Sequence, residues 1–336
     1  MTTVRLLLLW AGPALGAIWL TGCARPAEVG GSVVLYTSVP TGVIAGVETA
    51  FEERYPAVDL QVYRAGTGDV MARVEEELAA GRIGADLIWV ADFTVGEDLK
   101  ERGVLLQYTP PEAVALLATL RDEDGYYFGA RLLNMVVAYN TQAVAVPPSG
   151  YRDLLAPRYY RRVGHASPKT SGAFLYFMGA LLQDPGYGED FFRQLAGNEP
   201  AIQTNTQTTA RIAAGELDIG ITIDFTVRKL LGESPDAPID FVYPETGVVM
   251  APSPIAIFED APNVEGAKAF EQYILSQSGQ VLLRDLAGVV PVRLDVTPPD
   301  GIESITQLRV IPADPAWIQA HRDQVLSVFT TFYGEQ

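Results

Sequence analysis

The stretch from Ser32 to Gly42 places hydroxyl side chains where a ligand could be bound. Thr37, Ser38 and Thr41 follow an apolar run, and an amphipathic pattern begins directly after them. This order predicts a strand, a turn and the start of a helix. Amides at a helix start have no partner within the helix and carry the positive end of its dipole, so this site suits an anionic or polar ligand. The same residue types also occur as ordinary N-caps with nothing bound.

Two further polar loops follow predicted strands in the N-terminal half. A strand at 58–62 precedes the loop AGTGD at 65–69, and a buried strand at 86–90 precedes ADFT at 91–94. Strands that alternate with helices predict a parallel sheet, in which ligands gather at the carboxyl ends of the strands. The AGTGD loop has neither the GxGxxG spacing nor the lysine of a P-loop, so we expect no nucleotide cofactor, and no other cofactor is predicted.

The second half of the chain repeats this arrangement. Predicted strands at 163–166, 201–203 and 218–222 are followed by polar loops at 167–172, 204–209 and 223–226. The extended apolar stretches 126–140 and 247–258 are interpreted as two crossings between the halves. Two sheets whose polar ends face each other across a hinge predict a cleft that closes on a ligand.

The N-terminus has the features of an export signal. Arg5 precedes an apolar segment that is too short and too interrupted for a membrane span. The segment ends in Leu-Thr-Gly-Cys at 20–23, which resembles the bacterial lipoprotein box. Cys23 is the only cysteine, so lipid attachment gives it a use that an internal disulfide cannot. We therefore predict a lipoprotein signal peptide over 1–23, ending at a lipidated Cys23, and a tether over 24–31.

Length and charge limit the remaining possibilities. About 310 residues follow the signal peptide, more than one hydrophobic core usually organises, so two lobes are expected. The formal charge of −17, from 41 acidic and 24 basic residues, argues against nucleic acid or an anionic membrane surface as a partner.

Motifs spread along the chain resemble those of periplasmic solute-binding proteins of ABC importers, in the branch that contains the ferric-ion-binding proteins. The early motifs are VVLYTS at 33–38, AFEERYP at 50–56, AGTGDVMARVEEE at 65–77, ADLIWVAD at 85–92 and YNT at 139–141. The later motifs are AAGELDIGIT at 213–222, FVYPETG at 241–247 and APNVEGAKAFEQYILSQSGQ at 261–280.

The resemblance implies a two-lobed α/β periplasmic-binding-protein fold of type II, in which each lobe is a mostly parallel sheet flanked by helices and two strands form the hinge. Lobe 1 is expected to comprise 32–130 and about 250–290, and lobe 2 about 131–249 and about 291–336. The implied function is capture of a small polar or anionic solute between the lobes and its delivery to an ABC permease, without catalysis. We expect a monomer on the periplasmic or extracytoplasmic face, held to the membrane by its lipid.

The sequence departs from the ferric-ion binders of this branch at three places. Those proteins carry two adjacent tyrosines after the GIT-type strand, where this chain has Asp224-Phe225-Thr226. The first loop lacks the histidine that some members use, and Ala91-Asp92 stands where a ligating glutamate is expected. These differences argue against tyrosinate coordination of iron, so no metal site is predicted. A ferric-ion-binding protein with other ligands, Asp92 and Asp224 among them, is an alternative.

Other members of the branch bind phosphorylated sugars, aminoethylphosphonate and related organophosphates, which suit loops of hydroxyls and backbone amides. We therefore favour an organophosphate or a phosphonate as the solute. Asp224 is expected to contact an ammonium group or sugar hydroxyls, and His165 to donate to an anion. The expected contacts are Ser38, Thr41, Thr67, Gly68, Asp92, His165, Ser171, Gly172, Thr206 and Asp224.

Two alternatives from other classes depend on different readings of the same residues. His165 lies near Ser167, Lys169 and Ser171, where a nucleophile and a general base can be imagined, as in an extracytoplasmic phosphoester hydrolase. Neither a GxSxG elbow nor the SxxK spacing supports catalysis there, so no catalytic residue is predicted. The second alternative is a sensory binding module that passes closure of the cleft to a receptor.

Overall fold

The computed structural model describes residues 29–300, 302 and 306–334 of the 336-residue chain. The predicted signal peptide, Cys23 and most of the predicted tether lie outside the described residues. Within the described part of the chain, no helix is both long enough and apolar enough to cross a membrane.

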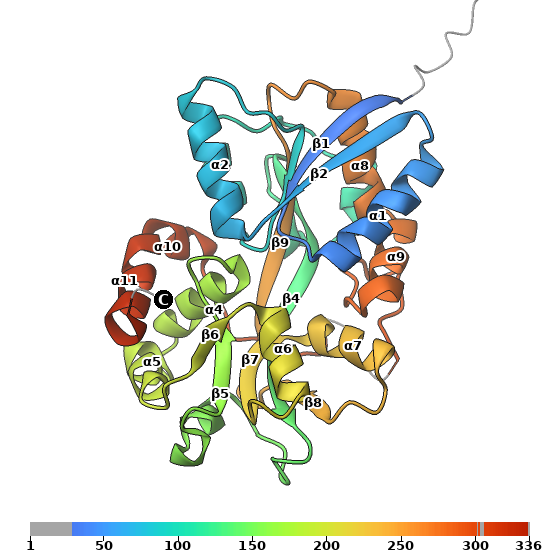
Figure 1. Ribbon diagram of the computed structural model, residues 1–336. Coiled ribbons are helices and arrows are strands. Elements are labelled where there is room, and N and C mark those ends of the chain that lie inside the picture. The colour runs from blue at the N-terminus through green and yellow to red at the C-terminus, as the bar shows by residue number, and fades with distance from the viewer. Residues whose placement is uncertain (1–28, 301, 303–305, 335–336) are drawn as a thin grey trace, which may run out of the picture.

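Nine strands of the described chain form one sheet that runs through both halves of the molecule (Figure 1). The half drawn at the top of Figure 1, called lobe 1 here, contains the mutually parallel strands β1 (Gly31–Thr37), β2 (Val58–Arg64) and β3 (Leu87–Trp89). The other half, lobe 2, contains β5 (Val163–Ala166), β6 (Ala201–Gln203), β7 (Ile219–Ile223) and β8 (Ile239–Val242). In lobe 2, β5 pairs in parallel with both β6 and β7.

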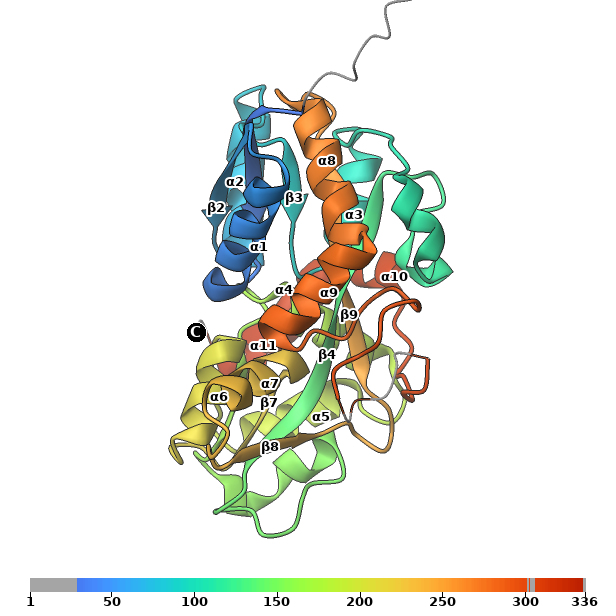
Figure 2. The same ribbon diagram turned by 90° about the vertical axis from the view of Figure 1, so that its right-hand side faces the viewer.

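Two long strands, β4 (Tyr127–Asn140) and β9 (Val249–Ile257), connect the lobes. They pair with each other in antiparallel orientation along 127–135 of β4, and the rest of β4 pairs with β7 and β8. Figure 2 shows β4 as one continuous strand that passes from lobe 1 into lobe 2. These strands correspond to the crossings predicted at 126–140 and 247–258, and the predicted two-lobed α/β fold with a two-strand hinge is confirmed.

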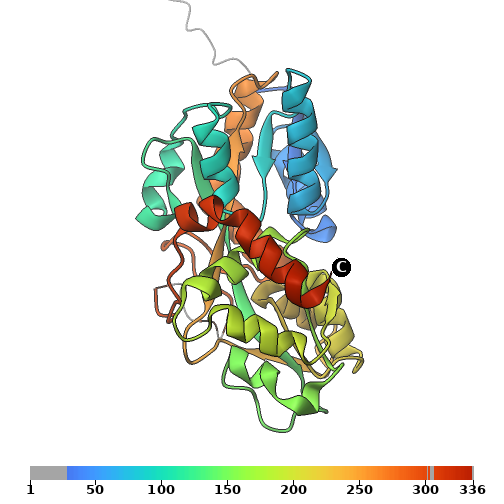
Figure 3. The ribbon, with the colours of Figure 1, turned by 90° about the vertical axis from the view of Figure 1, so that its left-hand side faces the viewer.

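Helices cover both faces of the sheet in each lobe. Lobe 1 carries α1 (Thr41–Arg54), α2 (Thr67–Ala79), α3 (Thr94–Glu101), α8 (Val264–Leu275) and α9 (Gln277–Ala287). Lobe 2 carries α4 (Gly172–Gln183), α5 (Gly188–Ala196), α6 (Asn205–Ala213) and α7 (Asp224–Glu233). The C-terminal helices α10 (Pro315–Ala320) and α11 (Arg322–Tyr333) lie across the junction of the lobes (Figure 3), and α10 packs against both α3 and α4. Short 3₁₀ segments occupy Pro111–Ala115, Ala118–Leu120, Tyr151–Leu155 and Pro157–Tyr159.

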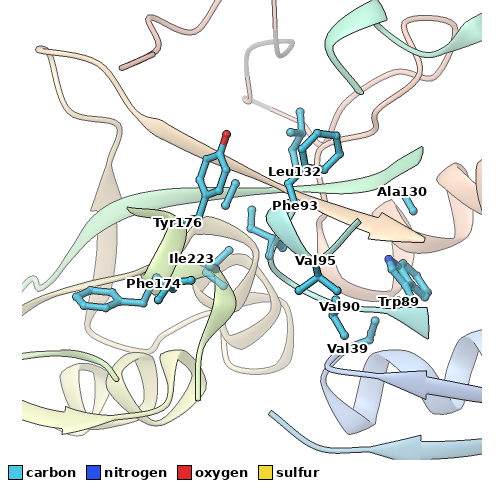
Figure 4. Packing of buried hydrophobic residues seen from close by; sticks show 14 of the residues in the cluster. Val39, Trp89, Val90, Phe93, Val95, Ala130, Leu132, Phe174, Tyr176 and Ile223 are labelled. Carbon is cyan, nitrogen blue, oxygen red and sulfur yellow. The ribbon is translucent and has the colours of Figure 1, made fainter. Parts of the chain in front are cut away.

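The main hydrophobic core continues from one lobe into the other. All residues of β4 are buried, which explains the long apolar run in this part of the sequence, because this strand is covered on both faces. Figure 4 shows apolar side chains of lobe 1, including Trp89 and Phe93, in one cluster with Phe174 and Ile223 of lobe 2. The hinge is therefore part of a shared core, and the lobes are not independent folding units joined by a linker.

One acidic side chain lies inside this apolar packing. Glu271 on α8 is only 1% exposed, and its Oε2 atom has no hydrogen-bond partner among the described residues. Burial, together with the charge of Glu112, raises the pKa of Glu271 well above the usual 4.5. The folded state therefore retains a proton that the unfolded chain releases. The stabilisation that comes from this proton is fully present below pH 4.5, and it is lost as the pH rises through the pKa of Glu271 in the folded protein.

We expect Glu271→Gln to raise the free energy of unfolding at pH 7 by about 1 kcal/mol or more, since each pH unit of this linkage contributes about 1.4 kcal/mol. Urea unfolding at pH 4.5 and pH 7 measures the effect, and the gain should shrink at the lower pH. Glu265→Gln, at an exposed position of the same helix, is the matched control. An identical effect of Glu271→Gln at both pH values would contradict this assignment.

Candidate functional site

A cavity of about 310 Å³ lies between the lobes and is lined by residues of both. Lobe 1 contributes the loops that follow β1, β2 and β3, through Ser38, Thr67 and Ala91. Lobe 2 contributes the starts of α4, α6 and α7. The cavity therefore lies at the carboxyl ends of the parallel strands, where this class of sheet binds ligands.

Hydrogen bonds hold the three loops of lobe 1 together at the cavity. The Thr67 hydroxyl donates to Ser38 Oγ over 3.1 Å and accepts from the Ala91 amide over 3.4 Å. The Ser38 amide donates to the Trp89 carbonyl at the end of β3 over 3.2 Å. Ser38 and Thr67, both predicted as contacts, therefore lie side by side in the cavity wall.

On the lobe 2 side, the hydroxyls combine capping with exposure to the cavity. Ser171 Oγ is the N-cap of α4, where it accepts from the Phe174 amide over 3.3 Å and from Asn205 Nδ2 over 3.0 Å. Thr204 caps α6 in a reciprocal arrangement with Gln207. A hydroxyl at this site can therefore cap a helix and also face a ligand, so the two interpretations given above are compatible.

Four helices begin at the cavity wall: α2, α4, α6 and α7. The first residues of α2, α4 and α6 (Thr67, Gly172 and Asn205) line it, as do Phe225 and Thr226, the second and third residues of α7. A helix start carries amides without a partner inside the helix and the positive end of the helix dipole, so the four together favour an anionic group. Some of these amides are capped by side chains, as the Phe225 amide is by Asp224 Oδ1 over 2.7 Å. Of the predicted contacts, Ser38, Thr67, Ser171, Gly172 and Thr206 line the cavity.

Gly68 and Gly172 lie where the lobes touch. A Cβ atom on Gly68 would lie 2.1 Å from the Lys169 carbonyl oxygen of lobe 2, and one on Gly172 would lie 2.5 Å from Asp92 Cβ of lobe 1. Only glycine permits backbones to approach this closely. The lobes are therefore closed over the cavity. Gly68 is outside the lining, as is Thr41, which is an exposed residue at the start of α1.

The two predicted acidic contacts are buried, do not line the cavity and have partners within the protein. Asp92 accepts from the Thr94 hydroxyl over 2.7 Å and pairs with Arg322 Nη1 of α11 over 2.8 Å. Asp224 pairs with Arg228 over 2.5 Å and accepts from Tyr243 and from Asn134. Neither carboxylate lines the cavity. The Asp92–Arg322 pair instead ties the end of β3 to the C-terminal helix.

His165 is likewise part of the core. Its ring is fully buried and stacks on Phe174 with the ring centroids 4.6 Å apart, while Nδ1 lies 2.9 Å from the Ala166 carbonyl. Burial lowers the pKa of His165 to about 4, so the ring is neutral at pH 7. His165 is outside the cavity lining, and in the described structure no hydrogen bond joins it to Ser171.

The structure adds lining residues that the sequence interpretation did not include. Arg131, Asn205 and Thr226 line the cavity, as do Arg64 and Asp69, which are both exposed residues. Arg131 carries the one recognisable signal, because it is the only charged residue in the apolar stretch 126–140. A charge in such a run is unusual unless it has a partner or a function.

Metal-binding groups are sparse at this site. Asp69 is the only carboxylate among the described residues that line the cavity, and no tyrosine or histidine is among them. Across the described chain, no cluster of three or more His, Cys, Asp or Glu side chains has the arrangement needed to hold a metal ion. Hydroxyls, amides and arginine thus make up most of the polar groups of the lining, beside apolar residues such as Leu133, Ile223 and Phe225.

Comparisons with known proteins agree with this architecture. An uncharacterised protein of Haemophilus influenzae is 26% identical over 270 residues, covering 76% of each chain. The crystal structure of iron-bound HitA from Pseudomonas aeruginosa superposes with a TM-score of 0.80 at 20% identity, covering 90% of this chain and 99% of HitA. AfuA from Actinobacillus pleuropneumoniae, solved with exogenous fructose-6-phosphate, also gives 0.80 at 20% identity, with coverage of 91% and 99%.

The fold of the described chain therefore matches solved periplasmic binding proteins of type II. The model of one protein family, described as bacterial extracellular solute-binding protein, matches residues 84–314, which is more than half of the chain and includes the lobe 2 side of the cavity. The interlobe cavity and this match together show that the chain belongs to the bacterial extracellular solute-binding proteins, the binding components of ABC transporters.

Proposed function

We propose that this protein captures a small anionic solute, with an organophosphate or a phosphonate favoured, in the cavity between its lobes and delivers it to an ABC permease. The observation that carries this proposal is the convergence of four helix starts, two lobes and several hydroxyls on one cavity. Such sites stabilise phosphate-like groups through short hydrogen bonds from amides and hydroxyls, without a metal. AfuA, which shares the fold, was solved with a sugar phosphate bound.

The donor set of the cavity supports an oxyanion more strongly than a ferric ion. HitA, which shares the fold, was solved with iron bound. Ferric iron is a hard cation that requires several anionic oxygen ligands, and Asp69 alone supplies a carboxylate among the described lining residues. The positive ends of four helices would also repel a cation.

Hydrolysis receives no support from the same residues. The Ser171 hydroxyl is occupied as an N-cap and as an acceptor from Asn205. His165 Nε2, the ring nitrogen that would act as a base, is buried without a hydrogen-bond partner in the described structure. A nucleophile requires a base within hydrogen-bond reach, so binding without turnover is the function we propose.

We further propose that a lipid on Cys23 holds the protein at the membrane as a monomer. The Leu-Thr-Gly-Cys sequence at 20–23 and the absence of a second cysteine support the anchor. We expect labelled palmitate to be incorporated into the wild-type protein in its native host and not into Cys23→Ser. Equal incorporation into both would contradict the anchor.

We expect Thr67→Val to weaken binding of the solute by about 10-fold, because the Thr67 hydroxyl positions Ser38 Oγ over 3.1 Å, and a displaced Ser38 hydroxyl loses one hydrogen bond to a charged group, at a cost of about 1.5 kcal/mol or more. A thermal-shift screen of organophosphates, phosphonates and ferric citrate identifies the solute, since a ligand at 100 times its Kd adds about 2.7 kcal/mol of stability. Thr49→Val, at an exposed position of α1, is the matched control. Stabilisation by ferric citrate alone would contradict the proposal.

We expect Gly68→Ala to hold the lobes apart and to lower solute affinity by about 10-fold or more, because its Cβ would meet the Lys169 carbonyl of the opposite lobe at 2.1 Å. Gly68 lies inside helix α2, so alanine suits its own lobe. Small-angle scattering in the presence of solute should show a larger radius of gyration for this variant. Gly232→Ala is the matched control, since its Cβ meets nothing within 4 Å. A Gly68→Ala protein that closes and binds the solute as wild type does would contradict this role of Gly68.

A further inference from the structure

Arg131 reaches the cavity from the hinge strand β4, beside an irregularity in its pairing with β9. Gly129 pairs with Pro254 and Arg131 with Ser253, so Ala130 is an extra residue in the ladder. Proline has no N–H to donate, which favours such a bulge, and a bulge changes the direction of the side chains next to it. Arg131 lines the cavity although its side chain is only 1% exposed.

The Arg131 guanidinium has few partners within the protein. Its Nη2 atom donates to Ser253 Oγ over 3.2 Å. The Nε and Nη1 atoms are buried and have no acceptor among the described residues. No described carboxylate forms an ion pair with it, in contrast to Arg228 and Arg322, which are paired with Asp224 and Asp92. Buried charges are normally paired, because an unpaired buried charge is costly.

The surroundings of Arg131 stabilise the positive charge only in part. The guanidinium carbon lies 5.0 Å from the ring centroid of Trp89 in lobe 1 and 6.0 Å from that of Phe225 in lobe 2. Aromatic faces attract a cation, but they do not replace hydrogen-bond acceptors for the N–H groups in the plane of the guanidinium. Burial lowers the pKa of Arg131 to about 9, which leaves it charged at neutral pH.

We propose that Arg131 determines the charge of the solute, by donating its buried Nε–H and Nη1–H groups to oxygen atoms of an anionic head group in the cavity. The inference rests on the proposed function and narrows it to solutes whose buried end is a phosphoryl, phosphonyl or similar group with several oxygens. Charge-assisted bonds from a planar guanidinium suit such a group. A cationic ligand would face an uncompensated positive charge in a dry environment.

The test compares Arg131→Met and Arg131→Lys with wild type, and uses Arg193→Met on the exposed surface of α5 as the matched control. Four probes are titrated separately: glucose 6-phosphate and glucose, which differ by one phosphoryl group, 2-aminoethylphosphonate, and inorganic phosphate. We expect an anionic probe to bind wild type, Arg131→Met to lose about 100-fold or more in affinity, and Arg131→Lys to retain part of it. Without ligand, Arg131→Met should have a melting temperature equal to or above that of wild type, because a buried unpaired charge has been removed.

Each outcome decides between the two proposals. One outcome is that glucose binds wild type and Arg131→Met with equal affinity and that no anionic probe binds either protein. Capture of a solute between the lobes is then supported, and the role proposed for Arg131 is wrong. Wild-type affinity of Arg131→Met for an anionic probe, with Arg193→Met unchanged, also overturns it. If no probe binds wild type, the ligand-free melting temperature decides. A clear loss in Arg131→Met identifies a structural cation and overturns the inference, whereas an equal or higher melting temperature supports it.

Discussion

The structure depends on one constraint, which is that the first amides of a helix have no partners within the helix. In a parallel α/β sheet every helix that follows a strand begins at the same edge, so these unpaired donors accumulate there. Here α2, α4, α6 and α7 bring theirs to one cavity from two lobes. Local hydroxyls such as Ser171 and Thr204 satisfy some of the amides. The remaining donors and the positive dipole ends favour an anion in the cavity, although the chain as a whole carries a formal charge of −17.

The closed arrangement of the lobes follows from close backbone contact. Gly68 and Gly172 let the loops of the opposite lobes approach to distances that a Cβ atom would prevent, and the Asp92–Arg322 pair adds a polar contact between the loop after β3 and α11. A solute that contacts both lobes stabilises this state only by the interactions that it gains on closure. Because the hinge strands β4 and β9 belong to both lobes, such interactions are transmitted through a continuous core.

The fold was predictable from the sequence because its signals are local. Apolar runs followed by hydroxyl loops mark the strand ends, and this pattern predicts Ser38 and Thr67 at the end of one sheet, facing Ser171 and Thr206 at the end of a second; all four line the cavity. The surroundings of Asp92, Asp224 and His165 were not predictable in the same way. Asp92 pairs with an arginine 230 positions away, and His165 owes its burial to rings of α4 and α11. Nothing near these residues in the sequence reveals such partners, so their polarity alone suggested a ligand.

Arg131 shows the converse case, in which the sequence carried a signal that only the structure makes interpretable. A single arginine within a buried strand conflicts with the apolar pattern around it. Proteins usually resolve such a conflict with a carboxylate, as Asp224 does for Arg228 nearby. At Arg131 the described protein offers only a serine hydroxyl and two aromatic faces, and the side chain lies between Trp89 of lobe 1 and Phe225 of lobe 2. An anion bound there would be held by the hinge strand and by both lobes at once, so charge recognition and closure would depend on the same contacts.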